Sequence, residues 1–161
     1  MQRWSRMGIM ALALAAVTPA GAADPGERAF RRGDYTRAAA LLRAKAEAGQ
    51  AEAQSYLGYQ YQYGLGVPKS YEEAAHWFLR AAEQGEPSAQ FFLGLLYDKG
   101  LGLPEDPIEA EKWLDLAAAH APAARREYWA SMRDIIAGKM TRDEAAEARR
   151  RAVAWYPVRE R

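Results

Sequence analysis

Apolar residues recur every three or four positions along almost the whole chain after residue 24, and runs of alternating apolar and polar β-branched residues are missing. This spacing places apolar side chains on one face of successive helices, so it predicts an all-α protein. Capping residues three positions before a glutamate, and glycines after the last apolar position, indicate the helix boundaries. The pattern predicts eight helices, at about residues 25–32, 36–48, 51–63, 71–84, 87–99, 107–120, 122–137 and 141–155.

One sequence pattern occurs twice, 36 residues apart, over residues 53–85 and 89–121. Each copy reads A-Q-x-x-L-G-x-x-Y-x-x-G-L-G-x-P and continues with E-A-x-x-W-x-x-x-A-A. A fixed period of this length is typical of a stack of similar small units. The eight helices are therefore expected to pair into four antiparallel hairpins.

The repeated residues suggest how the units pack. Gly58 and Gly94 lie in the middle of predicted helices, where glycine costs up to about 1 kcal/mol relative to alanine, so a close approach between helices is expected there. Trp77 and Trp113 are large enough to fill the space between successive hairpins. The Gly-Leu-Gly sequence after each first helix predicts a turn with backbone angles that other residues resist.

These residues resemble the Sel1-like repeat, a member of the tetratricopeptide-like helical repeats. The resemblance covers residues 51–85 and 87–121 as full repeats and residues 24–49 as a partial N-terminal repeat, and residues 122–157 would form a C-terminal capping hairpin. It implies an α/α solenoid of antiparallel hairpins with a right-handed superhelical twist. It also implies a non-enzymatic module that binds a peptide or protein partner in its concave groove, in cell-envelope assembly, secretion or signalling.

In tetratricopeptide-type units the first helix of each hairpin lines the groove, and the repeated positions are used in packing. Positions at which the two copies differ are therefore candidates for partner contact, and they mix aromatic with polar side chains as recognition surfaces do. The candidates are Glu52, Ser55, Tyr59, Gln62 and Tyr63 in one unit, and Ser88, Phe91, Leu95, Asp98 and Lys99 in the next. A further step of 36 reaches Ala124, Glu127, Ser131, Asp134 and Ile135, of which Glu127 and Asp134 complete the set. The pattern is equally compatible with Tyr59, Phe91 and Leu95 packing on the neighbouring hairpin.

The N-terminus has the features of a secretory signal. Arg3 and Arg6 precede the apolar stretch 8–17, and small residues follow up to a cleavage position after Ala22 or Ala23. An apolar run of about ten residues is too short to span a bilayer. Signal type and family habit together predict export to the periplasm of a Gram-negative bacterium, with no stable membrane insertion after cleavage.

The charge distribution narrows the range of partners. The net charge is +1 for the whole chain, and residues 24–46, 47–121 and 122–161 carry +3, −8 and +4. A net charge near zero gives no general attraction to nucleic acid, so no nucleic-acid partner is predicted. An acidic middle between basic ends leaves weak self-association as an alternative.

The sequence offers few candidates for catalytic or metal-binding residues. The chain has no cysteine, and no serine lies in a nucleophile motif. His76 has no second histidine nearby, and adjacent acids such as Glu72 and Glu73 are expected at helix starts. No catalytic residue, metal site or cofactor is predicted, although an envelope hydrolase or glycan-processing factor remains the alternative class.

Overall fold

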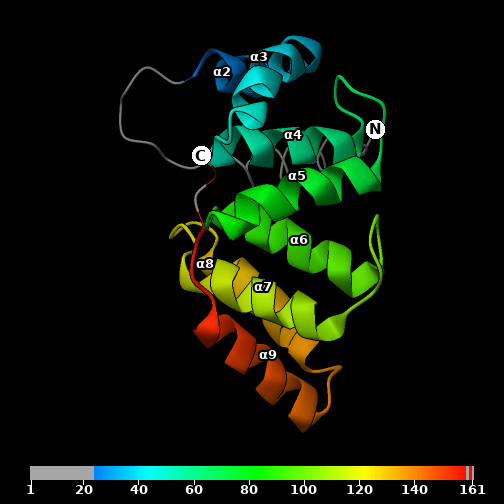
Figure 1. The fold of residues 1–161 in the computed structure, drawn as a ribbon, viewed down its shortest axis with the longest axis vertical. Helices are drawn as coiled ribbons and strands as arrows, with labels where there is room; N and C mark the ends of the chain where they lie inside the picture. The colour runs from blue at the N-terminus through cyan, green and yellow to red at the C-terminus, as the bar shows by residue number, and fades with distance from the viewer. Residues whose placement is uncertain (1–23, 159, 161) are drawn as a thin grey trace.

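The computed structural model describes residues 24–158 and 160, and every regular element within them is an α-helix (Figure 1). The signal predicted for residues 1–23 lies outside the described residues. In chain order the helices are α2 (Pro25–Arg31), α3 (Tyr35–Glu47), α4 (Ala51–Tyr63), α5 (Tyr71–Glu83), α6 (Pro87–Lys99), α7 (Pro107–Ala119), α8 (Arg126–Ala137) and α9 (Arg142–Ala154).

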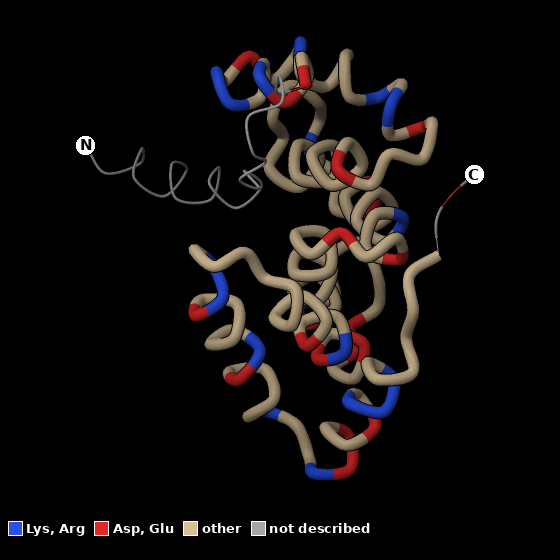
Figure 2. Tube along the Cα trace, turned by 90° about the vertical axis from the view of Figure 1, so that its left-hand side faces the viewer, with Lys and Arg blue, Asp and Glu red and all other residues tan. Residues whose placement is uncertain are grey.

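Helices that follow one another in the chain lie side by side from α2 to α8, so the molecule is a stack (Figure 1). The α/α solenoid expected from the sequence is confirmed. Figure 2 shows Lys and Arg gathered mainly toward the two ends of the stack, which matches the charge distribution along the sequence. No helix of the described part is both long enough and apolar enough to cross a membrane.

The helix starts follow the capping residues. Asp24, Ser70 and Asp106 each accept a hydrogen bond from a backbone N–H of the first turn. Thr141 and Glu144 form a complete capping box at the start of α9. These bonds satisfy amide groups that a helix cannot pair internally, which is why the boundaries could be predicted closely.

Mid-helix glycines allow the two helices of a unit to approach. A Cβ on Gly58 would lie 2.8 Å from the ring of Phe78, and one on Gly94 would lie 2.7 Å from Cγ of Leu114. The close contact expected at both glycines is confirmed. The buried Trp77 and Trp113 are also confirmed as packing residues, although Phe78 and Leu114 were not recognised as the residues that meet the glycines.

The last unit differs from the predicted capping hairpin. Residues 122–125 form a turn, so α8 begins at Arg126. Helix α9 packs on α7 instead of forming a close pair with α8. After α9, residues 155–158 and 160, here called the return segment, run back along the stack toward α4 (Figure 1).

Candidate functional site

A continuous set of aromatic rings lies beneath the surface formed by α4, α6 and α8, here called the first-helix face. The ring of Phe30 is 5.7 Å from that of Tyr59, which is 5.4 Å from Phe92. Phe91 adjoins Phe92 and stacks on Trp129 at 4.9 Å between centroids. These rings connect α2, α4, α6 and α8 into one packed layer, so the helices of this face have little freedom to move apart.

Four of the predicted contact residues belong to this layer or lie beside it. Tyr59 is 3% exposed and Phe91 is 2% exposed, and the side chains of Ser55 and Ser88 are buried too. Burial also raises the pKa of the Tyr59 hydroxyl well above its usual range. These four side chains are unavailable to a partner. For Tyr59 and Phe91, the structure thus favours packing over partner contact.

Other predicted residues are only partly accessible. Asp98 accepts hydrogen bonds or ion pairs from Lys99 and Lys139. Burial acts in the opposite direction, but these ammonium groups hold the pKa of Asp98 below its usual value. Gln62 donates a hydrogen bond to the hydroxyl of Tyr63 at 3.1 Å. Because Asp98 is already paired, it is a poor candidate for binding a basic partner group.

The structure exposes one large apolar residue on this face that the sequence did not mark. Tyr128 is 56% exposed, and Ile135, two turns later on the same side of α8, is 55% exposed. The equivalent residue of each preceding unit is buried: Phe92 lies 36 positions before Tyr128, and Tyr56 lies 36 positions before Phe92. The repeat therefore predicted a core residue at Tyr128. In the structure the ring of Tyr128 meets that of Phe91 at 5.9 Å between centroids, and more than half of its side chain stays exposed.

An apolar stripe results on the first-helix face. It consists of Tyr63, Leu95, Tyr128 and Ile135, of which Tyr63 and Leu95 are half-buried. Burial raises the pKa of Tyr63 to about 12, with smaller contributions from Tyr71 and Tyr128. Exposed Glu52, Lys99, Glu127 and Asp134 lie on the same three helices.

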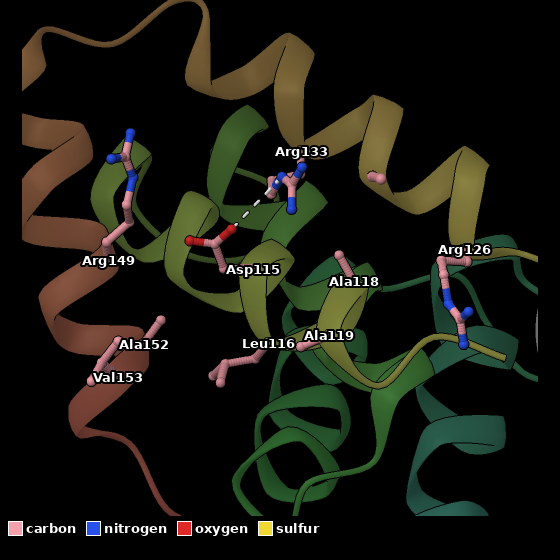
Figure 3. Close-up of a pocket in the computed structure, with 10 residues that line it drawn as sticks. Asp115, Leu116, Ala118, Ala119, Arg126, Arg133, Arg149, Ala152 and Val153 are labelled. Carbon is pink, nitrogen blue, oxygen red and sulfur yellow. Dashed lines mark ion pairs between the residues drawn. The ribbon is translucent and has the colours of Figure 1, made fainter. Parts of the chain in front are cut away.

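A second feature is a cleft of about 560 Å³ between α7, α8 and α9 (Figure 3). Its floor is made of small or apolar side chains and its walls carry arginines. In Figure 3, a dashed line joins Arg133 of α8 to Asp115, and Arg149 of α9 lies on the other side of Asp115. The lining residues are Asp115, Leu116, Ala118, Ala119, Arg126, Ala130, Arg133, Arg149, Ala152 and Val153.

The cleft exists because the packing of the first two units is not repeated. Phe78 and Leu114 are each the eighth residue of their helix and fill the space against a glycine. The eighth residue of α9 is Arg149, and Ala130 stands 36 residues after Gly94. A guanidinium opposite a methyl group cannot replace that apolar contact without being desolvated, so α8 and α9 remain apart.

Charges in the cleft are largely balanced. Nε of Arg133 lies 3.7 Å from the carboxylate of Asp115, and Arg133 also pairs with Asp134. Glu111, one turn before Asp115, is 3% exposed, and burial together with the charge of Asp115 raises its pKa to about 7. Both carboxyl groups project from one side of α7. They do not face each other across a cleft, as the acid and base of a glycoside hydrolase do.

Each histidine contacts a residue of its own helix. Nδ1 of His120 lies 3.0 Å from the carbonyl oxygen of Leu116, at the end of α7. His76 is exposed and meets Trp77 edge to face. Within residues 24–158 and 160, no group of three or more metal-ligating side chains comes together.

The fold and the packed helix pairs define an α/α helical-repeat protein. The model of the Sel1 repeat family matches residues 51–86 and 87–121. Residues 51–121 therefore consist of two Sel1 repeats, and proteins with this repeat are generally protein-interaction modules. No curated protein matches the chain.

Two solved structures have the same fold. One is c5321, a protective antigen of uropathogenic Escherichia coli strains that displays an SLR fold, with 32% identity and a TM-score of 0.72 over 79% of this chain. The other is a Sel1 repeat protein from Oxalobacter formigenes, with 39% identity and a TM-score of 0.53 over 55% of this chain. This chain spans only 27% and 26% of their respective lengths.

Proposed function

We propose that this protein is a non-enzymatic, exported scaffold that binds a peptide or protein partner on its first-helix face. The observation that carries the proposal is the exposure of Tyr128 and Ile135, which lie two turns apart on the same side of α8. Large apolar side chains that remain exposed on a rigid surface are typical of sites that a partner covers. The packed aromatic layer below supports tight binding, because little conformational freedom would be lost on association.

The expected partner surface is apolar in its centre and mixed in charge at its edge. Tyr63 and Leu95 extend the stripe from α8 to α4 and α6, and Glu127 and Lys99 offer one charge of each sign. A helix or an extended segment with two or three apolar anchors would cover such a stripe. Work in the cell envelope, in assembly, secretion or signalling, is the proposed setting.

The compartment is proposed from the sequence alone. Residues 1–23 have the order of basic, apolar and small residues found in secretory signals, and the chain has no cysteine that would need oxidation. To test export, the full chain should be expressed in a Gram-negative host, fractionated, and measured by intact mass. A periplasmic product lacking 22 or 23 residues is expected. A cytoplasmic product that keeps Met1 contradicts export.

The binding surface is tested by cross-linking and pull-down from envelope extracts with the mature chain. Tyr128→Ala combined with Ile135→Ala should lose the captured partner while its melting temperature stays close to that of the parent. Val153→Ala is the matched control, because Val153 is an exposed apolar residue on α9, away from the stripe. Equal recovery by all three proteins would exclude the stripe as the binding surface.

Gel filtration separates this proposal from self-association. A monomer at low and at high salt is expected for a scaffold whose partner is a different protein. A dimer at low salt that dissociates in about 1 M salt, where the Debye length is about 3 Å, would favour contacts between the acidic middle and the basic ends of two copies.

A further inference from the structure

The return segment lies across the turns that join one unit to the next, and its contacts resemble those of a bound peptide. The backbone N–H of Val158 donates to the carbonyl oxygen of Glu83 at 2.8 Å. Two residues later, Glu160 receives two hydrogen bonds from Arg80, from Nε at 2.8 Å and from Nη2 at 2.5 Å. Gln54 adds a third, from Nε2 at 3.0 Å.

The groups that receive Glu160 are held in place by other parts of the fold. The guanidinium of Arg80 lies over the ring of Trp77, 4.9 Å from its centroid. Gln54 is fully buried, and its amide is fixed by Nε2 of Gln84 at 2.8 Å and by the carbonyl oxygen of Ala46 at 3.0 Å. A planar guanidinium that is already oriented favours two-point binding of a carboxylate. The site is therefore built by α4 and α5, without help from the return segment.

Two glycines keep the path of the segment open. Gly49 and Gly85 have φ angles of 85° and 90°, as the turns require. A Cβ on Gly49 would approach Cβ of Glu160 to 3.0 Å, and one on Gly85 would approach Cβ of Pro157 to 3.4 Å. An extended backbone can lie directly on the turns because neither residue carries a side chain.

The return segment contributes little of its own side-chain surface to this contact. Tyr156 is 74% exposed and Val158 is 60% exposed. Apart from Trp155, which meets Trp113 edge to face at 6.0 Å, the segment is held by backbone and by one carboxylate. Arg80 lowers the pKa of Glu160, as expected for a carboxylate bound in its charged form. A contact with so little buried apolar area is suited to exchange.

The site occurs once in the stack. The residues 36 positions before and after Arg80 are Ala44 and Leu116, neither of which can bind a carboxylate. The glutamine, in contrast, recurs as Gln90, which binds the carbonyl oxygen of Ala82 in the same way that Gln54 binds Ala46. Arg80 is thus the residue that allows a carboxylate to bind in this unit and not at the equivalent positions of the other units.

We propose that Arg80, Gln54 and the carbonyl of Glu83 form a binding site for an extended, carboxylate-bearing segment of a partner protein, which the return segment occupies in its absence. Specificity comes from one carboxylate placed two residues after the amide that reaches Glu83. The side chains of Tyr156 and Val158 are exposed, so a partner segment is free to vary at the positions equivalent to these two. The site is separate from the first-helix face, so the partner segment would displace the return segment without competing for the stripe.

A synthetic peptide with the sequence of residues 154–161, labelled with fluorescein, serves as the probe in fluorescence anisotropy with the mature chain. The parent protein should bind it weakly, because the return segment is present at an effective concentration in the millimolar range (~1 mM). Glu160→Gln weakens this internal competitor and should tighten peptide binding about tenfold or more. Adding Arg80→Gln to that variant should abolish the gain, whereas Arg150→Gln, at an exposed arginine of α9, should leave it unchanged.

Three further measurements make the outcome decisive. A peptide in which the glutamate corresponding to Glu160 is replaced by glutamine should lose most of its affinity, and Tyr128→Ala with Ile135→Ala should bind the original peptide like the parent. Thermal unfolding of Glu160→Gln should match the parent. Equal affinity of both peptides, equal affinity with and without Arg80, no binding to Glu160→Gln, or a large loss of thermal stability in Glu160→Gln would each show that the return segment is a structural staple and overturn the proposal.

Discussion

The two glycines of the Gly-Leu-Gly turn after α6 provide a matched pair for testing how the units are joined. Both have left-handed backbone angles, with φ of 60° at Gly100 and 73° at Gly102. Their surroundings differ. A Cβ on Gly100 would lie 3.3 Å from Cβ of Glu105, a crowded contact that a small shift of the glutamate can relieve, whereas one on Gly102 would overlap the carbonyl oxygen of Tyr71 and lie 2.6 Å from the nitrogen of Glu72.

This difference sets the expected free energies. An alanine held in the left-handed region costs about 1–2 kcal/mol, so Gly100→Ala should destabilise the protein by that amount. Gly102→Ala carries the same cost and must also push the turn away from the start of α5, and overpacking of this kind adds about 1–3 kcal/mol. The total loss expected for Gly102→Ala is about 2–5 kcal/mol.

Urea unfolding followed by far-UV circular dichroism measures both values, provided that the m-value is the same in the parent and the variants. The same comparison can be repeated in the preceding unit, where a Cβ on Gly66 would lie 2.5 Å from the nitrogen of Thr36 and one on Gly64 would be 3.2 Å from Cβ of Lys69. Equal losses at the two positions of a turn would refute the reasoning, because they would mean that the turn does not rest on the preceding unit.

Three other substitutions test the core and the cleft. Glu111→Gln should remove a pH dependence of stability, because burial raises the pKa of Glu111 from 4.5 to about 7. The parent should therefore lose up to about 3 kcal/mol of unfolding free energy as the pH rises from 4.5 through 7, and the glutamine variant should not. Urea unfolding at pH 5 and pH 8 measures the difference. Gly94→Leu should cost about 1–3 kcal/mol through overlap with Leu114, and unchanged melting would exclude the close helix contact. Trp129→Ala should cost about 3–5 kcal/mol because it removes a fully buried ring, and a loss below about 1 kcal/mol would mean that α8 is not anchored there.

Most of the fold could be predicted because its signals are local. A capping residue such as Ser70 or Asp106 acts within one turn of its own helix, so it identifies a boundary without knowledge of the tertiary structure. The glycine at the end of α4 and of α6 does the same through its left-handed angle. The 36-residue period then predicted which helices form a unit.

The last unit could not be predicted from the same signals. Trp129 stands where the repeat has leucine, and the structure keeps this position buried, so the repeat register continues into α8. An arginine such as Arg149 is expected on the polar outer face of a terminal unit, although its place in α9 corresponds to Phe78 and Leu114. That correspondence depends on where α9 begins, and helix boundaries are known from sequence only to within a few residues.

The candidate site was predicted in part, for a physical reason. Positions that differ between the two repeats were assigned to binding, but differences also arise when neighbouring helices adjust to one another's volume. Ser55 and Phe91 occupy equivalent positions, as do Tyr59 and Leu95, and the larger residue stands in the second unit in one pair and in the first unit in the other. Tyr59 and Phe91 are consequently buried by packing. No comparison of the two repeats could mark Tyr128, since its equivalents are core residues.

The exposed part of the stripe and the return segment both belong to the part of the chain that follows the repeats. Inside the stack each helix has neighbours on two sides, and packing uses nearly every large side chain. At the last unit α9 packs on α7 and not on α8, and Tyr128 and Ile135 of α8 remain exposed. The position of α9 against α7 in turn sends residues 155–158 back toward Glu83, where they reach the carboxylate site of Arg80.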